Sequence, residues 1–600
     1  MGIGHALSPQ SELRNPAPFA SGRKTWFAAG LLLLLLVGGY LRISRLGDHS
    51  ITHPEMYVPG IRLPEGLSQP RQRLTLVSVL TGTFSSDTHP PGYYVLMWAW
   101  TKCFGAGIWS IRIPAALLGL GCVPLLLWLG LLLRQPAAAW IGAALLAVNG
   151  HHVFWSRTAR MFSLTCFLGL LATVLLLYLL RTKRSNRPLA VAYVVVLLLG
   201  LSAHVFFWLV LGTHGLWILW NEWSNSQSMP SAFRLQILAF ILGSPLLAFS
   251  AYQSGTFVAP LSNAVGVYAR EFVQFAFVLP LQGFSTGLYL PSGPFPPIDD
   301  THVPGWHIAF LLLSLVLLFA GVLALSQKQR QEVLRTFDDG PSAKIWVTAA
   351  SLAMLAILAF VFVARRILGS SAHGTLRTTE AMSIMPFLVT ALAIVLERCW
   401  GRFRGEGPRL GMFAGGQGLI VMLALVPFAI LLAASGLTPM LNARGMMFLD
   451  PYLLLVLAVG FISVFSKNRW VGIVLILLLA LVHIDGLREY RPMATDPTDY
   501  QSLVKELSAK YRQDDIVFVQ PGLWTTPFLY YMTPDRYRLV GDNYRHINQK
   551  YADSRVWVIV SYHQALSDDM RSALQNRHLV ASLKAAHAEA LLYSPESGSR

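Results

Sequence analysis

The chain has 600 residues, of which 54% are hydrophobic and only 13% are charged, against roughly 25% charged residues in soluble proteins. This composition excludes an ordinary soluble enzyme and predicts a protein embedded in a membrane. The formal net charge is +17, but Lys and Arg concentrate in short loops between apolar runs, so the charge indicates membrane topology and we expect no nucleic-acid partner. The four cysteines have neither metal-ligand nor disulfide spacing, so we interpret them as packing residues: Cys103, Cys122, Cys166 and Cys399.

Residues 1–24 are predicted to form a cytoplasmic tail. Arg14, Arg23 and Lys24 precede an apolar run that is too long for a signal peptide, so this run is predicted to be an uncleaved membrane anchor. Further apolar runs, each able to cross or nearly cross a bilayer, follow up to residue 487. The predicted spans are 25–43, 111–133, 137–150, 161–180, 189–205, 207–221, 235–252, 307–326, 345–363, 381–397, 413–435, 447–466 and 471–487.

This set of spans places the basic loops on one side of the membrane. The loops at 181–187, 328–344, 398–409 and 467–469 then face the cytoplasm, as the positive-inside rule requires. We therefore predict an all-α polytopic membrane protein with about 13 transmembrane helices. Its membrane domain covers residues 25–487 and lies in the inner (plasma) membrane of the cell.

The last segment, 488–600, differs in composition from the spans. An odd number of spans places it on the extracytoplasmic side. Helix-like segments at 500–511 and 566–575 alternate with strand-like segments at 515–520, 555–561, 579–584 and 590–593, which predicts a small α/β domain. The almost wholly apolar run at 556–560 is typical of a central strand covered on both faces.

Three stretches predicted to face outward carry most of the side chains suited to chemistry. They are the long first loop at 44–110, the segment at 150–162 and the loop at 365–377. Arg157 and Arg160 stand three residues apart, so they would share a face of a helix. The ionisable residues of the three stretches include Glu55, Asp87, His89, Arg157, Arg160, Arg365, Arg366 and Arg377.

These side chains suit the transfer of a group from a lipid phosphate. An arginine stays charged in a low-dielectric setting and offers paired donors that match phosphate oxygens, so the five arginines are candidates for binding the donor phosphate. A carboxylate beside them can take a proton from an acceptor hydroxyl, and Glu55 and Asp87 are the candidates. A lipid-phosphate donor is already activated, so no nucleotide-binding domain is required.

Four segments, in order along the chain, resemble motifs of the polytopic C-type (GT-C) glycosyltransferases, which include protein O-mannosyltransferases and bacterial lipid A aminoarabinose transferases. The resemblance is strongest over residues 25–220. The chain has Pro54 before Glu55 where the family has an Asp-Glu pair. The four segments are His53-Pro54-Glu55, Asp87-Thr88-His89-Pro90-Pro91-Gly92-Tyr93-Tyr94, Arg112-Ile113-Pro114-Ala115 and Ser156 to Phe162.

The resemblance implies a GT-C fold and a reaction at the extracytoplasmic face. A sugar would move from a polyprenyl-phosphate donor, dolichyl or undecaprenyl, to a hydroxyl of a lipid, polysaccharide or protein. It implies that Glu55 is the base, that Arg160 binds the lipid phosphate and that Asp87 and His89 shape the site. No cofactor is required, although Asp87 and His89 can share a divalent metal cation. Tyr93 and Tyr94 are candidates for stacking on the sugar.

Other interpretations of the same residues stay open. Asp87 can start a helix as its capping residue, and Arg157 and Arg160 can extend to lipid headgroups. His151 and His152 are expected to make hydrogen bonds rather than to bind metal, since no third ligand follows at a suitable spacing. His204 and His214, which fall within predicted spans, are expected to be packing residues or to line a cavity rather than to bind metal.

The alternative functions are a transporter or flippase, or a non-catalytic polyprenyl-lipid-binding protein. Transporters place ionisable residues or broken helices near the bilayer midplane and show repeated halves. The predicted spans contain almost no charged residues, and the sequence shows no internal repeat. The long first loop also favours an active site at the membrane surface.

Overall fold

The structure is a computed structural model of the whole chain. It describes residues 21–48, 50–61, 74–81, 89–181, 186–223, 231–255, 314, 316–325, 415–435, 445–493, 499–519, 526–532, 536–540, 547–561, 566, 568–585 and 588–595. The predicted spans 345–363 and 381–397 lie outside the described residues. So do four candidate site residues, Asp87, Arg365, Arg366 and Arg377.

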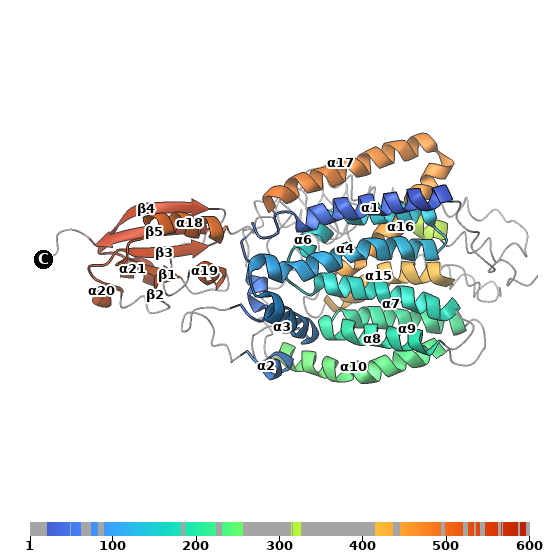
Figure 1. Ribbon diagram of the computed structural model, residues 1–600, viewed down its shortest axis with the longest axis horizontal. Coiled ribbons are helices and arrows are strands. Elements are labelled where there is room, and N and C mark those ends of the chain that lie inside the picture. Colours follow the sequence, from blue (N-terminus) through green and yellow to red (C-terminus); the bar gives the residue numbers. More distant parts are fainter. Residues whose placement is uncertain are drawn as a thin grey trace, which may run out of the picture.

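A bundle of apolar helices forms the larger part of the molecule (Figure 1). Each predicted span from 25–43 to 235–252, and from 413–435 to 471–487, contains one of these helices, and helical residues 316–325 lie within the predicted span 307–326. The helices are α1 Ser21–Ile43, α4 Ile108–Leu132, α5 Pro136–Val148, α6 Gly150–Ser156, α7 Phe162–Arg181, α8 Arg187–Ala203, α9 Phe207–Trp223, α10 Ser231–Gly255, α15 Gly415–Ser435, α16 Asp450–Lys467 and α17 Arg469–Met493.

Four helices in the described part of the chain are long and apolar enough to cross a bilayer by themselves: Thr25–Ile43, Ile108–Leu132, Phe162–Arg181 and Met447–Lys467. A fifth is reached when α5 and α6, which meet at an angle of 56°, are taken as one broken span. In α8, α9, α10, α15 and α17 the apolar segments that were compared with the length of a crossing are 10–17 residues long. The chain is thus a multi-pass helical membrane protein, with up to five complete spans among the described residues.

The predicted span 137–150 ends close to the end of α5, but the continuation into α6 at an angle of 56° was not predicted. Asn149 ends α5, and its side chain accepts a hydrogen bond from the backbone of His152, 2.9 Å away, which starts α6. The carbonyls left at the end of α5 are bound by Arg42 of α1, whose guanidinium donates to Ala147 O at 2.8 Å and Leu146 O at 3.0 Å. A buried arginine therefore satisfies backbone groups that lipid could not.

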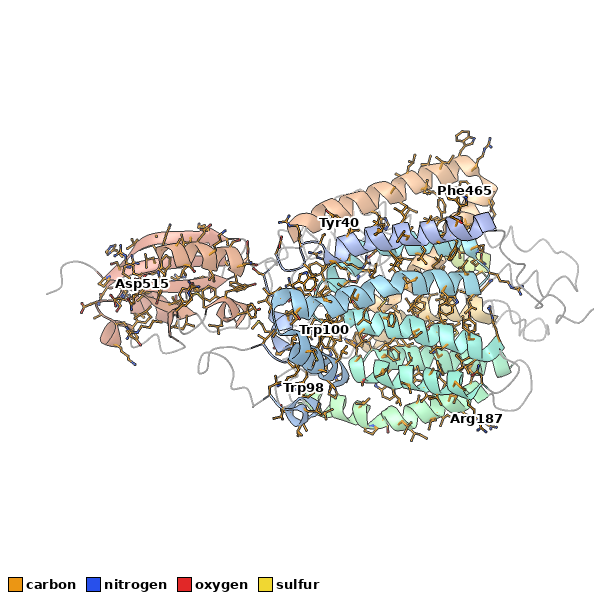
Figure 2. The ribbon with its side chains drawn as sticks, in the orientation of Figure 1. Tyr40, Trp98, Trp100, Arg187, Phe465 and Asp515 are labelled. Carbon is orange, nitrogen blue, oxygen red and sulfur yellow. The ribbon has the colours of Figure 1, made fainter. Side chains whose placement is uncertain are left out.

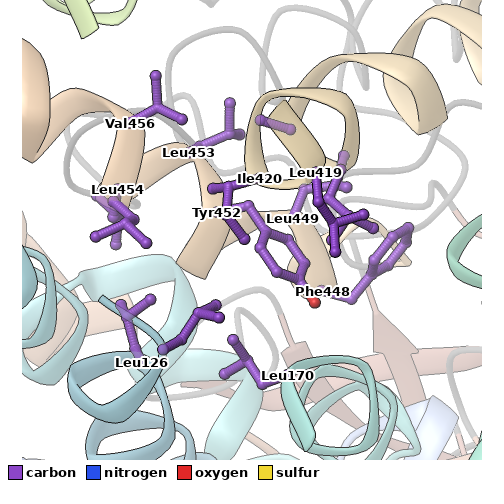
Figure 3. Close-up of a cluster of buried hydrophobic side chains, with 14 of the residues drawn as sticks. Leu126, Leu170, Leu419, Ile420, Phe448, Leu449, Tyr452, Leu453, Leu454 and Val456 are labelled. Carbon is purple, nitrogen blue, oxygen red and sulfur yellow. The ribbon is translucent and has the colours of Figure 1, made fainter. Parts of the chain in front are cut away.

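The centre of the bundle lies around α16, in which every residue from Asp450 to Phe461 is buried. Tyr452 OH lies 2.9 Å from Thr173 Oγ1, which in turn lies 3.2 Å from His214 Nε2. Lipid gives little hydrophobic force between helices, so close packing and such hydrogen bonds hold the bundle together. Figure 3 shows part of this core, to which α4, α7, α15, the 3-10 turn η6 Met447–Leu449 and α16 contribute Leu126, Leu170, Leu419, Ile420, Phe448, Leu449 and Leu453.

The first outer loop has more structure than predicted. It contains the 3-10 turn η2 His53–Tyr57, the short helix α2 Leu76–Leu80 and the helix α3 Gly92–Phe104. The N-cap residue of α3 is Pro91, and the alternative that Asp87 caps a helix lies outside the described residues. Figure 2 shows Trp98 and Trp100 of α3 at the end of the bundle that faces the C-terminal domain, whereas Arg187 lies at the opposite end.

Residues 499–595 form a sheet with flanking helices, placed beyond that end of the bundle (Figure 1). The strand order is β2-β1-β3-β5-β4, with β1 parallel to β2 and β3, and β5 antiparallel to β3 and β4. The elements are α18 Tyr500–Lys510, β1 Ile516–Val519, α19 Thr526–Tyr531, β2 Arg538–Val540, α20 Ile547–Lys550, β3 Val556–Ser561, α21 Asp568–Ala573, β4 Arg577–Ala585 and β5 Ala588–Pro595.

The prediction of a central apolar strand is confirmed by β3. Trp557 and Ile559 pack in one buried cluster, and Val556, Val558 and Val560 pack in another. Alternate side chains of a strand point to opposite faces, so both faces of β3 are covered.

Candidate functional site

Glu55 lies at the centre of a buried hydrogen-bond network. Thr52 is the N-cap residue of η2 and lies three residues before Glu55. The backbone N and the Oγ1 of Thr52 donate to Glu55 Oε2 at 2.9 and 3.1 Å. Arg112 of α4 donates from Nε to Oε1 at 2.8 Å and from Nη2 to Oε2 at 2.7 Å. The backbone N of Ala159 donates to Oε1 at 2.8 Å. The side chain of Glu55 is 0% exposed.

These contacts keep the Glu55 carboxyl ionised. Burial alone would raise its pKa, but the Arg112 guanidinium and the hydrogen bonds from Ala159 and Thr52 hold the pKa below its ordinary value. A general base needs an oxygen within reach of the acceptor hydroxyl and a pKa near the working pH. Both oxygens of Glu55 accept from the protein, so its surroundings suit a positioning role better than the base role expected from the sequence.

Arg112 extends the network to the end of the first membrane helix. Its Nη1 donates to Leu46 O at 3.0 Å, and its Nη2 donates to Ser50 O at 2.8 Å. Arg112 belongs to one of the sequence motifs, but no partner was predicted for it. The pairing of Glu55 with Arg112, 57 residues apart, could be found only from the fold.

Arg160 lies beside this network. Its Nη1 donates to Pro54 O at 3.1 Å and to Tyr94 OH at 3.3 Å, and its guanidinium lies 5.9 Å from the ring centre of Tyr57. The guanidinium therefore contacts the turn that carries Glu55 and the helix α3 that follows His89. Tyr93 and Tyr94 are each 2% exposed, which suits packing around Arg160 better than stacking on a sugar.

Arg157 has a different environment from Arg160. The prediction that the two share a helix face is wrong, because α6 ends at Ser156 and the next helix begins at Phe162. Arg157 Nη1 donates to Leu41 O at 3.0 Å and to Ser44 O at 2.7 Å, and its Nη2 donates to Arg45 O at 3.1 Å. These are carbonyls at the C-terminal end of α1, which a cation stabilises.

His89 lies at the start of α3, and its ring stacks on that of His204, with ring centres 5.0 Å apart. His204 ends α8, is 2% exposed, and accepts a hydrogen bond at Nδ1 from the backbone of Phe206 at 3.0 Å. It is buried as expected, but its place beside His89 was missed, because 115 residues separate the two in the sequence. Of the two residues predicted to share a cation, His89 is described and Asp87 is not.

His151 and His152 make hydrogen bonds, as predicted. His151 Nδ1 lies 2.9 Å from Asp450 Oδ2, and both side chains are at most 1% exposed. His152 Nδ1 lies 2.9 Å from Arg42 Nη2. Asp450 was not singled out from the sequence, although a buried acid at the start of a membrane helix is a signal that could have found it.

Within the described residues, one group has ligand atoms close enough for a metal ion: those of Cys122, His152 and Cys166 lie within 4.8 Å of one another, and all three are buried. Arg42 can only donate, so Nδ1 of His152 accepts and the ring proton lies on Nε2, which faces Cys166 Sγ at 3.8 Å. A metal-binding histidine usually donates from its second nitrogen instead. The group is therefore better described as a hydrogen-bonded cluster of packing residues.

No family model and no curated protein sequence matches the chain. Solved structures are similar at low identity. ArnT from Cupriavidus metallidurans in the apo state is 13% identical over 95% of this chain and 98% of its own, with a TM-score of 0.40. The Archaeoglobus fulgidus oligosaccharyltransferase tethered with an acceptor peptide is 12% identical over 96% of this chain and 74% of its own, with a TM-score of 0.43.

The arabinofuranosyltransferase AftD from Mycobacteria is 11% identical over 95% of this chain and 41% of its own, with a TM-score of 0.40. These TM-scores are below 0.5 and do not define the fold of this chain. The solved structures to which this chain is similar are C-type glycosyltransferases, the class whose motifs its sequence resembles.

Proposed function

We propose that the protein is a glycosyltransferase that moves a sugar from a polyprenyl-phosphate donor to an acceptor hydroxyl at the extracytoplasmic surface of the membrane. The observation that carries the proposal is the convergence of four sequence segments. Glu55 pairs with Arg112 and accepts from the backbone of Ala159, and Arg160 contacts Pro54 and Tyr94. The residues selected as motifs from the sequence are thus linked by hydrogen bonds at one end of the bundle.

In this proposal Arg160 binds the donor phosphate. A guanidinium keeps its charge in a poorly solvated place and stabilises the negative charge that grows as the phosphate departs. Arg365, Arg366 and Arg377 are proposed to add positive charge from their loop. Arg157 is proposed to stabilise the end of α1 instead, because its guanidinium donates to three carbonyls there.

The reaction is proposed to be a single displacement. The acceptor oxygen attacks the anomeric carbon, the bond from that carbon to the phosphate oxygen breaks, and the lipid phosphate leaves with the bonding electrons. Asp87 takes the acceptor proton, because both oxygens of Glu55 are already bound. Glu55 in turn fixes Arg112 and the backbone next to Arg160.

A divalent cation bound by Asp87 and His89 would supply further positive charge beside the phosphate. The imidazole of His89 suits such an ion, and the ring of His204 stacks on it with ring centres 5.0 Å apart. The steps above use only the side chains of the chain itself.

The test is sugar transfer by the purified protein in lipid nanodiscs, with a panel of polyprenyl-phosphate sugars. Arg160→Ala is expected to abolish transfer. Arg187→Ala is the matched control, because Arg187 is exposed at the opposite end of the bundle (Figure 2), and it should transfer like the unchanged protein. An Arg160→Ala variant with full transfer would contradict the role of Arg160. If the unchanged protein turned over no donor but still bound polyprenyl phosphate, it would be a lipid-binding or transport protein.

A further inference from the structure

The C-terminal domain contacts the first outer loop at Ser50, only five residues before Glu55. Ser50 Oγ donates to Asp499 Oδ1 at 3.1 Å and accepts from Gln501 N at 2.9 Å. Asp499 is also the N-cap residue of α18 and accepts from Ser502 N at 3.1 Å. The Ser50 hydroxyl is therefore part of the cap of a helix that lies about 450 residues later in the chain.

A second contact lies at the next residue. The backbone N of Ile51 donates to Tyr531 OH at 2.7 Å, and Ile51 is 0% exposed. Tyr530 OH donates to Ala106 O at 3.4 Å. Both tyrosines come from α19 and pack against the buried cluster that contains Ile51 and Tyr94. The tip of the C-terminal domain thus contributes to the apolar core around the candidate site.

Ser50 is also held from the membrane side, by the site itself. Arg112 Nη2 donates to Ser50 O at 2.8 Å, and the same nitrogen donates to Glu55 Oε2. Glu55 accepts from Ala159 N, directly before Arg160. Ser50 is therefore bound by the C-terminal domain through its side chain and by the site through its carbonyl.

We propose that the C-terminal domain positions the site, with Tyr531 and the start of α18 holding Ser50 and Ile51 so that Arg112, Glu55 and Arg160 keep their relative places. A misplacement of about 1 Å at a reacting group can lower a rate by about a hundredfold. The hydroxyl of Tyr531 is the single atom that accepts from Ile51 N among the hydrogen bonds described. Tyr531 is thus a positioning residue, and its effect on transfer rests on the proposed function.

Two measurements separate this proposal from the proposed function. The first is hydrogen exchange of the backbone at 46–57 in the full-length protein, which needs no activity. Tyr531→Phe keeps the ring but removes the acceptor of Ile51 N, so exchange at Ile51 should rise about tenfold, as expected for the loss of one hydrogen bond. Ser50→Ala should also raise exchange at 46–57, because it removes the hydroxyl that donates to Asp499 Oδ1. The matched control is Tyr593→Phe on β5, whose ring packs in the other cluster of the sheet.

The second measurement is transfer by the same variants. Tyr531→Phe should lower kcat by about tenfold or more with little change in KM, and Tyr593→Phe should change neither. Unchanged exchange at 46–57 in both Tyr531→Phe and Ser50→Ala would overturn the proposal. Raised exchange with unchanged kcat would show a contact without a positioning role and would also overturn it. If the unchanged protein transferred no sugar, the proposed function would fail, and the exchange data would still decide whether the domain holds the loop.

Discussion

The loss of stability from removing Glu55 and the loss from removing Arg112 should not add up when both are removed. The two side chains are 0% and 4% exposed, and they share two hydrogen bonds of 2.7 and 2.8 Å. Removing one partner of a buried ion pair costs about 3–5 kcal/mol, because the other charge stays buried. Glu55→Ala and Arg112→Ala should each lower the free energy of unfolding by about this amount. The double variant should lower it by much less than the sum of the two.

The assay is unfolding of the four proteins in mixed detergent micelles, followed by fluorescence. Glu55→Gln adds a pH test. Since the pKa of Glu55 is lowered from 4.5 in the folded protein, its contribution to stability is fully present above about pH 4.5 and is lost as the pH falls through the lower folded pKa. The stability gap between Glu55→Gln and the unchanged protein should therefore shrink in acid. The positioning role would be refuted if the changes in free energy of unfolding of the two single variants added up in the double variant. It would also be refuted if Glu55→Gln kept full stability but lost transfer, and Glu55 would then be restored as the base.

Three further outcomes are expected. Arg157→Ala should lower the free energy of unfolding by about 1.5–3 kcal/mol, as for hydrogen bonds from a charged group, without changing the affinity for polyprenyl phosphate measured by ligand titration. Asp450→Asn should destabilise the bundle in a detergent melt, since it replaces a carboxylate whose Oδ2 lies 2.9 Å from His151 Nδ1 in a buried place, and equal melting of both proteins would contradict this. Burial raises the pKa of Asp515, but Arg555 and other donors lower it below its ordinary value of 3.8. Exchange at β3 should therefore be faster in Asp515→Asn than in the unchanged protein at pH 7, with a smaller difference as the pH falls below 3.8.

The helices were predictable wherever the signal is local. Apolar runs predicted the positions of α1, α4 and α7, because a run of about 20 apolar residues is typical of a membrane-spanning helix. The break at Asn149 was not predictable from its surroundings, since it is stabilised by Arg42 from another helix. The helix α3 was missed because its 13 residues were taken as part of an outer loop.

The candidate site was predictable as a set of residues but not as a set of contacts. Motif order selected Glu55, Arg112 and Arg160, and these do lie together. Arg157 and Arg160 look alike in the sequence, and only the position of the end of α1 distinguishes them. The roles of Ser50 and Tyr531 depend on a contact across some 480 residues, for which the local sequence carries no signal.

Arg160 and its neighbours are proposed to bind the phosphate of a polyprenyl-phosphate donor. An electron cryomicroscopy structure of the protein in nanodiscs with polyprenyl phosphate bound tests this proposal. The phosphate is expected within hydrogen-bond distance of the Arg160 guanidinium, at the end of the bundle that carries α3. A phosphate bound at the opposite end, near Arg187, would contradict it.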